Sequence, residues 1–277
     1  MKQRHIGKLP VLLLLAAVLL MENSCMFLPE EEKNITDSDK GTLVWSDEFT
    51  NSGCPLTTKW KYQIGSGGWG NNEVQNYIDN SSSATTAYVS NGTLKIKAYK
   101  DGSTWKSARM NSRQSWKYGY IEAKMKVTNI KGFWPAFWMM PQDSIYGSWP
   151  SSGEIDIMEN APSTCGVNRV FSTLHAKGHY YDGNGGSGKS IGSKSFEDLE
   201  SEYHTFAIKW NENQIIAYYD GAEQGSYNND GNGYKNWPYD KEFYIILNLA
   251  VGGNLGGSGY NNHESAILEI DYVRVYQ

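Results

Sequence analysis

The sequence predicts an all-β fold, a sandwich of antiparallel strands, for residues 42–277. Three observations predict it. Short segments of alternating polar and apolar residues recur along the chain, and Gly, Asn and Ser lie between them. Helical periodicity is weak, since only residues 195–204 could form a turn or two. Of the 277 residues, 39% are hydrophobic, and no repeat or linker divides the chain after residue 42, so we expect one domain with a large core.

Three segments show clear alternation: residues 92–99, 120–127 and 267–276. Alternate side chains of a strand point to opposite faces, so each of these strands should place one face on the core and the other outward. In the second segment this rule puts Glu122 on the outward face.

Two other segments, residues 132–140 and 243–251, are apolar on both faces. Such segments are typical of strands in the middle of a sheet. Trp134 and Trp138 share one face of the first strand, and Asn248 lies on the face of the second that also carries Tyr244 and Ile246.

The segment "GEIDIMEN", residues 153–160, contains three acids. In a regular strand Glu154 and Asp156 would point to one face and Glu159 to the other. A β-bulge at residues 157–158 would absorb one residue and return Glu159 to the face of the other two acids. We therefore expect a bulge here, with three carboxyl groups on one side of a central strand.

Three interpretations of this triplet are open. Burial and like charge would raise at least one pKa, and a carboxyl pair with unequal pKa values is what glycosidic hydrolysis needs. A calcium cluster or an ordinary solvated strand face would use the same residue types. Ten Trp and nineteen Tyr in a hydrophilic chain favour a surface groove for sugars or other ring-shaped ligands. The acids follow "SWPSSG" in an aromatic-rich and centrally buried region, which favours the hydrolase.

The chain resembles glycoside hydrolase family 16, and in particular its laminarinase-like members. "GEIDIME" is similar to the family signature E-x-D-x-x-E in its bulged form. Further similar blocks occur in the family's order: "WSDEF" (45–49), "GWGNNEVQNY" (68–77), "SARMNSRQSWKYGYIEAKMKV" (107–127), "GFWPAFWMMP" (132–141), "GSWPSSGEIDIMEN" (147–160), "STLHAKG" (172–178), "WPYDKEFYIILNLAVGG" (237–253) and "EIDYVRVY" (269–276). The resemblance implies a curved β-jelly roll with a substrate cleft on its concave face.

The resemblance also implies catalytic roles for the triplet. Glu154 corresponds to the nucleophile and Glu159 to the acid/base of a retaining glycosidase, while Asp156 tunes the charge and orientation of the nucleophile. Retention requires the two glutamate carboxyls to lie roughly 5–5.5 Å apart. No metal or cofactor is expected in the reaction.

Around the acids, the resemblance implies a set of substrate-binding residues. Ring stacking is expected from three tryptophans, hydrogen bonds to sugars from polar residues on neighbouring strands, and a pKa-tuning contact beside the acid/base from a histidine. The set comprises Trp134, Trp138, Trp149, Asn72, Arg109, His175 and Asn248, with Glu122 as a further sugar contact. Glu48, Gly92 and Asp271 match a structural calcium site on the convex side, joining the N- and C-terminal strands.

The N-terminus indicates export. Residues 1–8 are basic and residues 11–21 form an apolar run of signal-peptide length, so residues 1–24 are expected to be removed. Cys25 follows a small residue and would be lipidated, as in bacterial lipoproteins. Residues 25–41 are polar and acidic and are expected to form a flexible tether. We expect an outer-membrane or cell-surface lipoprotein of a bacterium, or otherwise a periplasmic or secreted protein.

Three functions are weighed. The first is an endo-glycosidase for β-1,3 bonds of laminarin-like or mixed-linkage glucans. The second is the same chemistry on β-galactosyl bonds of mucin O-glycans or galactans, and the third is a non-catalytic glycan-binding surface protein, against which the two glutamates argue. The net charge of −5, with no basic cluster after the first eight residues, makes nucleic acid an unexpected partner, and a monomer is expected. Cys54 and Cys165 would either pair or remain two thiols.

Overall fold

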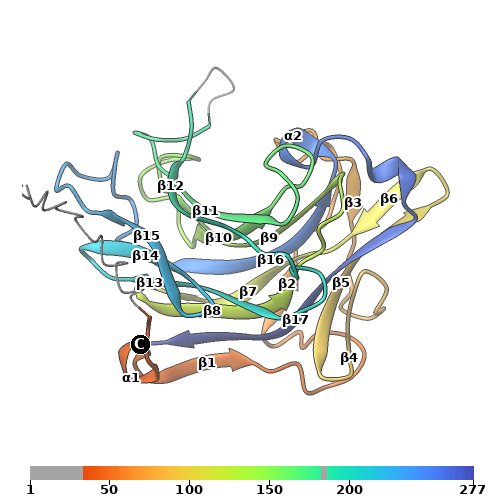
Figure 1. Cartoon of the computed structure of the whole chain (residues 1–277), viewed down its shortest axis with the longest axis horizontal. Coiled ribbons are helices and arrows are strands. Elements are labelled where there is room, and N and C mark those ends of the chain that lie inside the picture. Colours follow the sequence, from red (N-terminus) through yellow and green to blue (C-terminus); the bar gives the residue numbers. More distant parts are fainter. Residues whose placement is uncertain (1–33, 182–185) are drawn as a thin grey trace, which may run out of the picture. The chain divides into compact units, whose positions relative to one another are not determined.

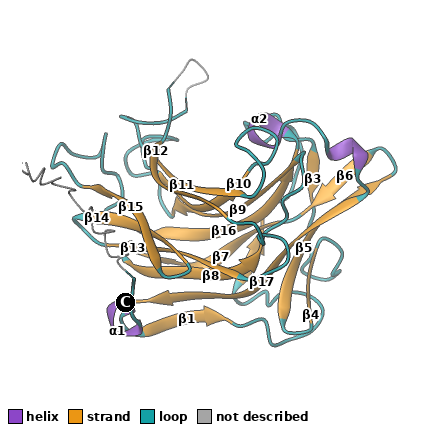
Figure 2. Ribbon diagram, in the orientation of Figure 1, coloured by secondary structure: helices purple, strands orange, loops and turns teal. Residues whose placement is uncertain are grey.

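The computed structural model describes residues 34–181 and 186–277, and nearly all regular structure within them is β-strand. The strands form two sheets that pack on one another (Figures 1 and 2). Three short helical segments accompany them: α1 (Asp37–Lys40), α2 (Gly253–Gly256) and the 3-10 turn η1 (Tyr260–Asn262). Residues 197–201 form turns and no helix. The predicted all-β sandwich is confirmed.

The larger sheet has ten strands in the described residues. Their order is β15 (Ala222–Asn228), β14 (Gln214–Tyr219), β13 (His204–Trp210), β8 (Gly119–Lys126), β17 (Ser265–Tyr276), β5 (Thr93–Asp101), β6 (Thr104–Ser107) and β3 (Gln75–Tyr77), with β1 (Leu43–Asp47) paired to β17 and β4 (Ala87–Ser90) paired to β5. All of these pairs are antiparallel except β3 with β6.

The smaller sheet has seven strands in the described residues, all paired antiparallel. Their order is β12 (Lys189–Ser195), β11 (Arg169–His175), β10 (Glu154–Asn160), β9 (Phe133–Pro141), β16 (Phe243–Val251), β7 (Arg109–Trp116) and β2 (Trp60–Tyr62). Segments 132–140 and 243–251 thus form β9 and β16 in the middle of this sheet, as their apolar faces predicted.

The core lies between the two sheets. Ile121 and Met125 of β8 face Phe137 of β9 and Ile155 of β10 within one cluster of side chains that have no exposed surface. The other face of the seven-stranded sheet carries the site. In Figure 2 the loops near β12 and the turn at α2 rise on either side of β9, β10 and β11.

One outward side chain of β8 differs from the prediction. Glu122 does face away from the core, but its side chain is only 1% exposed, because other parts of the chain cover it. Lys40 of α1 places Nζ 3.2 Å from its Oε2, and the Tyr276 hydroxyl donates to its Oε1 at 3.2 Å. Glu122 belongs to the ten-stranded sheet, away from the acids of β10, so the expected sugar contact is wrong.

The segment expected as a tether is attached to the domain over the part that the structure describes. The Ile35 N–H donates to the Gly221 carbonyl at 2.8 Å, and the Thr42 N–H donates to the Gln277 carbonyl at 2.8 Å. Residues 34–41 therefore lie against the ten-stranded sheet and are no free linker. The signal peptide (1–24) and Cys25 fall outside the described residues. Between residues 34 and 277, leaving out 182–185, no helix is long and apolar enough to cross a bilayer.

Cys54 and Cys165 are half-buried free thiols. Of the two alternatives weighed from the sequence, the structure has the unpaired one.

Candidate active site

The three acids lie on β10, and the strand is irregular between them. Its register shifts between Asp156 and Glu159 against β11, and between Asp156 and Met158 against β9. Asp156 lies opposite Trp138 and Glu159 lies opposite Ala136, both on the same face of β9. The predicted β-bulge is confirmed. We call this side of the seven-stranded sheet the acid face.

Two tryptophans donate hydrogen bonds to the two glutamates. Nε1 of Trp134, on β9, donates to Oε1 of Glu159 at 2.8 Å. Nε1 of Trp149, in the loop before β10, donates to Oε2 of Glu154 at 2.5 Å. Each glutamate is thereby fixed by an indole from a different segment, and both rings lie beside the acids as predicted.

The predicted histidine lies beside the middle acid. His175 pairs with Glu154 across β10 and β11, and its Nε2 lies 3.2 Å from Oδ2 of Asp156. The sequence placed it beside Glu159, whereas its closest recorded polar partner in the described residues is Asp156. The Trp149 ring lies over the same area, 6.1 Å from the imidazole centroid.

All three acids have raised pKa values. Burial, followed by the charge of Asp156, raises the pKa of Glu154 to about 8, while His175 and the Trp149 hydrogen bond oppose that rise. Burial raises the pKa of Asp156 to about 7, and a hydrogen bond with Glu154 acts in the opposite direction. Burial and then Asp156 raise the pKa of Glu159 well above its ordinary value. Burial thus favours the protonated form of each of the three carboxyl groups.

A hydrogen-bonded chain connects the acid face to a buried acid that the sequence analysis did not single out. Nε1 of Trp138 donates to Oδ1 of Asn248 at 2.7 Å, and Nδ2 of Asn248 donates to the Tyr77 hydroxyl at 3.1 Å. That hydroxyl donates to Oε2 of Glu73 at 3.1 Å, and Gln75 donates to the same oxygen at 2.6 Å. Asn248 thus braces Trp138, and Glu73 orients the far end of the chain.

Arg109 is the first residue of β7, the strand beside β16, and Asn72 lies in the turn before β3. The Arg109 guanidinium lies 4.6 Å from the ring centroid of Trp138 and 5.0 Å from that of Trp69. Nδ2 of Asn72 donates to Oδ1 of Asn254 at 2.8 Å. The block "GWGNNEVQNY" contained the missed residues as well as Asn72, but Tyr77 and Asn72 make their contacts with Asn248 and Asn254, which are distant in the sequence.

One group among the described residues could hold a metal: ligand atoms of Glu154, Asp156 and His175 lie within 4.8 Å of one another. Two carboxylates with an imidazole suit a transition metal better than calcium, which prefers oxygen ligands alone. The calcium interpretation of the triplet is therefore not favoured.

The set predicted for a structural calcium ion is engaged differently. Glu48 accepts hydrogen bonds from Nε and Nη2 of Arg274 at 2.9 and 2.8 Å, and Asp271 lies 3.2 Å from Nζ of Lys124. Gly92 lies in the turn between β4 and β5 with φ of 76°. Both carboxylates are thus held by basic side chains, so calcium binding there would rest on backbone carbonyls and stays a prediction.

Known proteins with similar sequences support the glycosidase interpretation of the acids. Residues 72–274 match the family model described as Glycosyl hydrolases family 16. The chain belongs to this family. A beta-glucanase of Rhodothermus marinus is 37% identical over 248 residues, which cover 85% of each chain. A glucan endo-1,3-beta-glucosidase of Cryptopygus antarcticus is also 37% identical, over 84% of this chain and 90% of its own length.

A solved structure extends the likeness to the family 16 fold. The laminarinase of Rhodothermus marinus superposes with a TM-score of 0.78 at 35% identity, covering 85% of this chain and 97% of that one. Together with the two antiparallel sheets, this likeness confirms the jelly roll predicted from the sequence. As a family 16 member, the chain is a glycoside hydrolase.

Proposed function

We propose that the chain is a retaining endo-β-1,3-glucanase that hydrolyses internal bonds of laminarin-like or mixed-linkage β-glucans. The observation that carries this proposal is the bulge of β10, which places Glu154 and Glu159 on one face, each held by its own indole N–H. The names of the similar proteins, a beta-glucanase, a glucan endo-1,3-beta-glucosidase and a laminarinase, support the substrate class.

The reaction would proceed in two displacements. In the first, an oxygen of the Glu154 carboxylate attacks the anomeric carbon while Glu159 gives its proton to the departing glycosidic oxygen. A covalent glycosyl ester on Glu154 results. In the second, Glu159, now ionised, takes a proton from water, whose oxygen attacks the anomeric carbon and releases Glu154. The raised pKa of Glu159 favours the protonated carboxyl group, which donates its proton in the first step.

His175 and Trp149 would help Glu154 to ionise before the attack, because both lower its pKa, whereas Asp156 raises it. Asp156 hydrogen-bonds to Glu154, and Nε2 of His175 lies 3.2 Å from Oδ2 of Asp156, so the middle acid holds both groups in place. The indole of Trp149 then stabilises the resulting carboxylate.

The experiment that tests the function uses the full chain with laminarin, lichenan, curdlan, agarose and mucin O-glycans as substrates. We expect oligosaccharides from laminarin with retained anomeric configuration, and their loss in Glu154→Gln. Glu197→Gln, an exposed glutamate in the turn before β13, serves as the matched control. A mechanism-based 2-fluoro glycoside should label the peptide that contains Glu154.

Other outcomes would replace the proposal. Products from mucin O-glycans or agarose alone would keep the mechanism and change the substrate to a β-galactoside. Binding without any hydrolysis would indicate a glycan-binding surface protein. Label on Glu159 in place of Glu154 would reverse the two roles.

We further propose that the protein is exported and anchored through a lipid on Cys25, with removal of residues 1–24. The basic start, the apolar run and the following cysteine support this proposal. Mass spectrometry of the mature N-terminus would find a lipid adduct at Cys25, and Cys25→Ala would move the protein from the membrane fraction to the soluble one. An unmodified cysteine with the signal intact would contradict it. Size-exclusion chromatography tests the expected monomer.

A further inference from the structure

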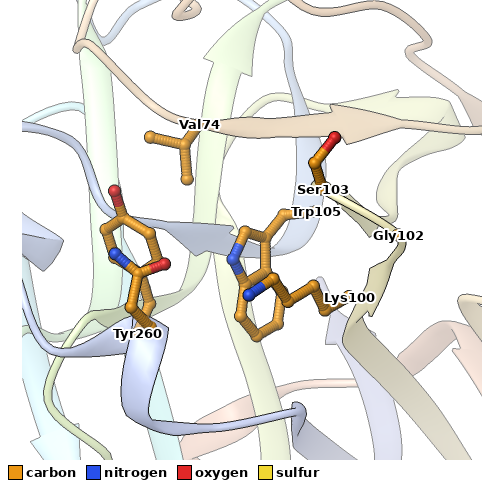
Figure 3. Close-up of a pocket in the computed structure, with 7 residues that line it drawn as sticks. Val74, Lys100, Gly102, Ser103, Trp105 and Tyr260 are labelled. Carbon is orange, nitrogen blue, oxygen red and sulfur yellow. The ribbon is translucent and has the colours of Figure 1, made fainter.

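A pocket of about 450 Å³ lies away from the acids, among residues of β5, β6 and η1 (Figure 3). This volume falls in the range of roughly 300–1,000 Å³ that small-molecule sites occupy. Its lining includes Val74, Lys100, Ser103, Trp105, Tyr260 and Asn261. None of these residues has a part in the reaction proposed above.

Trp105 contributes a buried donor to the pocket. Its side chain is 3% exposed, and its Nε1 has no hydrogen-bond partner among the described residues. Figure 3 shows the indole nitrogen turned toward Tyr260 and not toward the strand that carries Trp105. A buried donor without a partner is unfavourable, and a hydrogen bond to a ligand oxygen would offset that cost. Packing against Phe133 and Tyr260, at 5.4 and 6.2 Å between ring centroids, holds the indole edge-on.

The other lining groups combine apolar surface with hydrogen-bonding groups. Val74 is 41% exposed, and the Tyr260 ring stands opposite Trp105. Lys100 extends across the pocket toward the indole, and its ammonium has no ion pair with any described residue (Figure 3). Rings and aliphatic side chains beside scattered donors match a pyranose, which has apolar C–H faces and a rim of hydroxyl oxygens. A single cation gives little basis for a polyanionic ligand.

The pocket shares its wall with the edge of the acid face. The Val74 N–H donates to the Val251 carbonyl at the end of β16 at 2.9 Å, and Asn254 donates through its N–H to Asn71 at 2.7 Å. Asn72, two residues before Val74, is bonded to Asn254. The segment 72–74 therefore carries the predicted sugar contact Asn72 and also borders the pocket through Val74.

We propose that this pocket is an accessory binding site for β-glucan, which holds glucosyl units of the polymer outside the stretch that is being cut. The inference rests on the proposed function for its ligand class. A polymer bound at both places gains effective concentration at the acid face, whereas an oligosaccharide too short to reach both gains nothing.

The test compares a long and a short substrate on pocket variants of the full chain. Ser103→Tyr fills the pocket from an exposed turn, Lys100→Gln removes the cation, and Trp105→Phe removes the indole N–H while keeping a ring. Lys97→Gln, on the same strand β5 but outside the lining, is the matched control. KM and kcat are measured with laminarin and with laminaritetraose, and laminarin binding is measured by titration in the Glu154→Gln background. Melting temperatures establish that each variant is folded, and the two surface variants suffice if Trp105→Phe does not fold.

We expect the pocket variants to raise KM for laminarin about fivefold and to leave both constants for laminaritetraose unchanged. Titration should lose a second, weaker binding step. A KM for laminarin equal to that of Lys97→Gln would overturn the inference, as would an equal rise for both substrates. If the wild type hydrolyses no β-1,3-glucan, the proposed function fails, and titration with laminarin then tests the pocket separately. Binding that Ser103→Tyr weakens would support the accessory site. Binding that Ser103→Tyr leaves unchanged, or no binding at all, would overturn it.

Discussion

The indole N–H of Trp134 donates to Oε1 of Glu159 at 2.8 Å, and it connects the apolar strand β9 to the buried acid that lies beyond the bulge of β10. A hydrogen bond to a carboxylate favours the ionised form, so this contact lowers a pKa that burial raises strongly. Trp134 therefore partly offsets the rise in the pKa of Glu159.

Replacing Trp134 with Phe should raise the pKa of Glu159 further. The alkaline limb of the kcat/KM profile, which reports loss of the acid's proton, should move to higher pH by roughly one unit, because a hydrogen bond to a charged group contributes about 1.5–3 kcal/mol. We also expect kcat to fall at least about tenfold as proton release becomes harder. A pH–rate series measures both, and an unmoved alkaline limb would show that the contact does not tune the acid.

Trp149→Phe should move the opposite limb. Trp149 donates to Glu154, and its hydrogen bond lowers a pKa that stands at about 8. Without the donor, Glu154 ionises at higher pH, so the acidic limb should shift upward. The shift should be smaller than for Trp134→Phe, roughly half a unit, because Trp149 is 45% exposed and water can replace the donor. The two variants control one another, since the hypothesis requires each to move one limb and to spare the other.

Glu154→Gln should stabilise the fold at alkaline pH. Folding raises the pKa of Glu154 from its ordinary value of 4.5 to about 8, so the folded state binds more protons than the unfolded state between these pH values. The free energy of unfolding must then fall as pH rises through that window. We expect the variant to exceed the wild type by roughly 1–3 kcal/mol at pH 8 and to equal it near pH 4. Urea unfolding at both pH values measures this difference, and Glu197→Gln should show none that depends on pH. Equal stability of Glu154→Gln and wild type at pH 8 would mean that burial costs the carboxylate nothing.

Period-two alternation was sufficient to predict the faces of β8, β9 and β16, because the side-chain direction of a strand is a local property. The bulge also followed from local spacing, since three acids in six positions suit one face only if a residue is extruded. The cover over Glu122 did not follow, because it depends on α1, which lies 82 residues away in the sequence. The series of hydrogen bonds from Trp138 to Glu73 was missed for the same reason, since Tyr77 and Asn248 are 171 residues apart.

Lys40→Met should destabilise the protein without changing its activity. Lys40 is the cation closest to the Glu122 carboxylate, whose side chain is 1% exposed, and its loss leaves Tyr276 at 3.2 Å and Arg274 at 4.0 Å. Removing one partner of a buried pair leaves a poorly compensated charge, so we expect a loss of about 1–3 kcal/mol in the free energy of unfolding.

The matched control for Lys40→Met is Lys124→Met on the same strand as Glu122. Lys124 and Asp271 also lie 3.2 Å apart, but their side chains are 37% and 35% exposed. Such a pair contributes about 0–1 kcal/mol. Comparable losses in the two variants would mean that burial of Glu122 does not strengthen its pairing, and a fall in kcat for Lys40→Met would contradict the separation of α1 from the acid face.

Tyr77→Phe tests whether the buried chain positions Trp138. The Tyr77 hydroxyl accepts from Asn248 and donates to Glu73, so its removal leaves both without that partner. Asn248 can then turn away from the Trp138 indole that it holds at 2.7 Å. We expect KM to rise about five- to tenfold with a smaller change in kcat, and a loss of about 2 kcal/mol in the free energy of unfolding.

Tyr62→Phe supplies the matched comparison, because the Tyr62 hydroxyl is buried on β2 without a hydrogen-bond partner in the described residues. Its removal deletes an unpaired polar group and should leave KM unchanged and stability equal or higher. If Tyr77→Phe is less stable than the wild type but has the same KM, the hydrogen bonds from Trp138 to Glu73 stabilise the fold and do not position the ring. Glu73→Gln keeps an acceptor for the Tyr77 hydroxyl. If KM rises in Tyr77→Phe but has the wild-type value in Glu73→Gln, then the hydrogen bond itself, and not the charge of Glu73, positions the Trp138 ring.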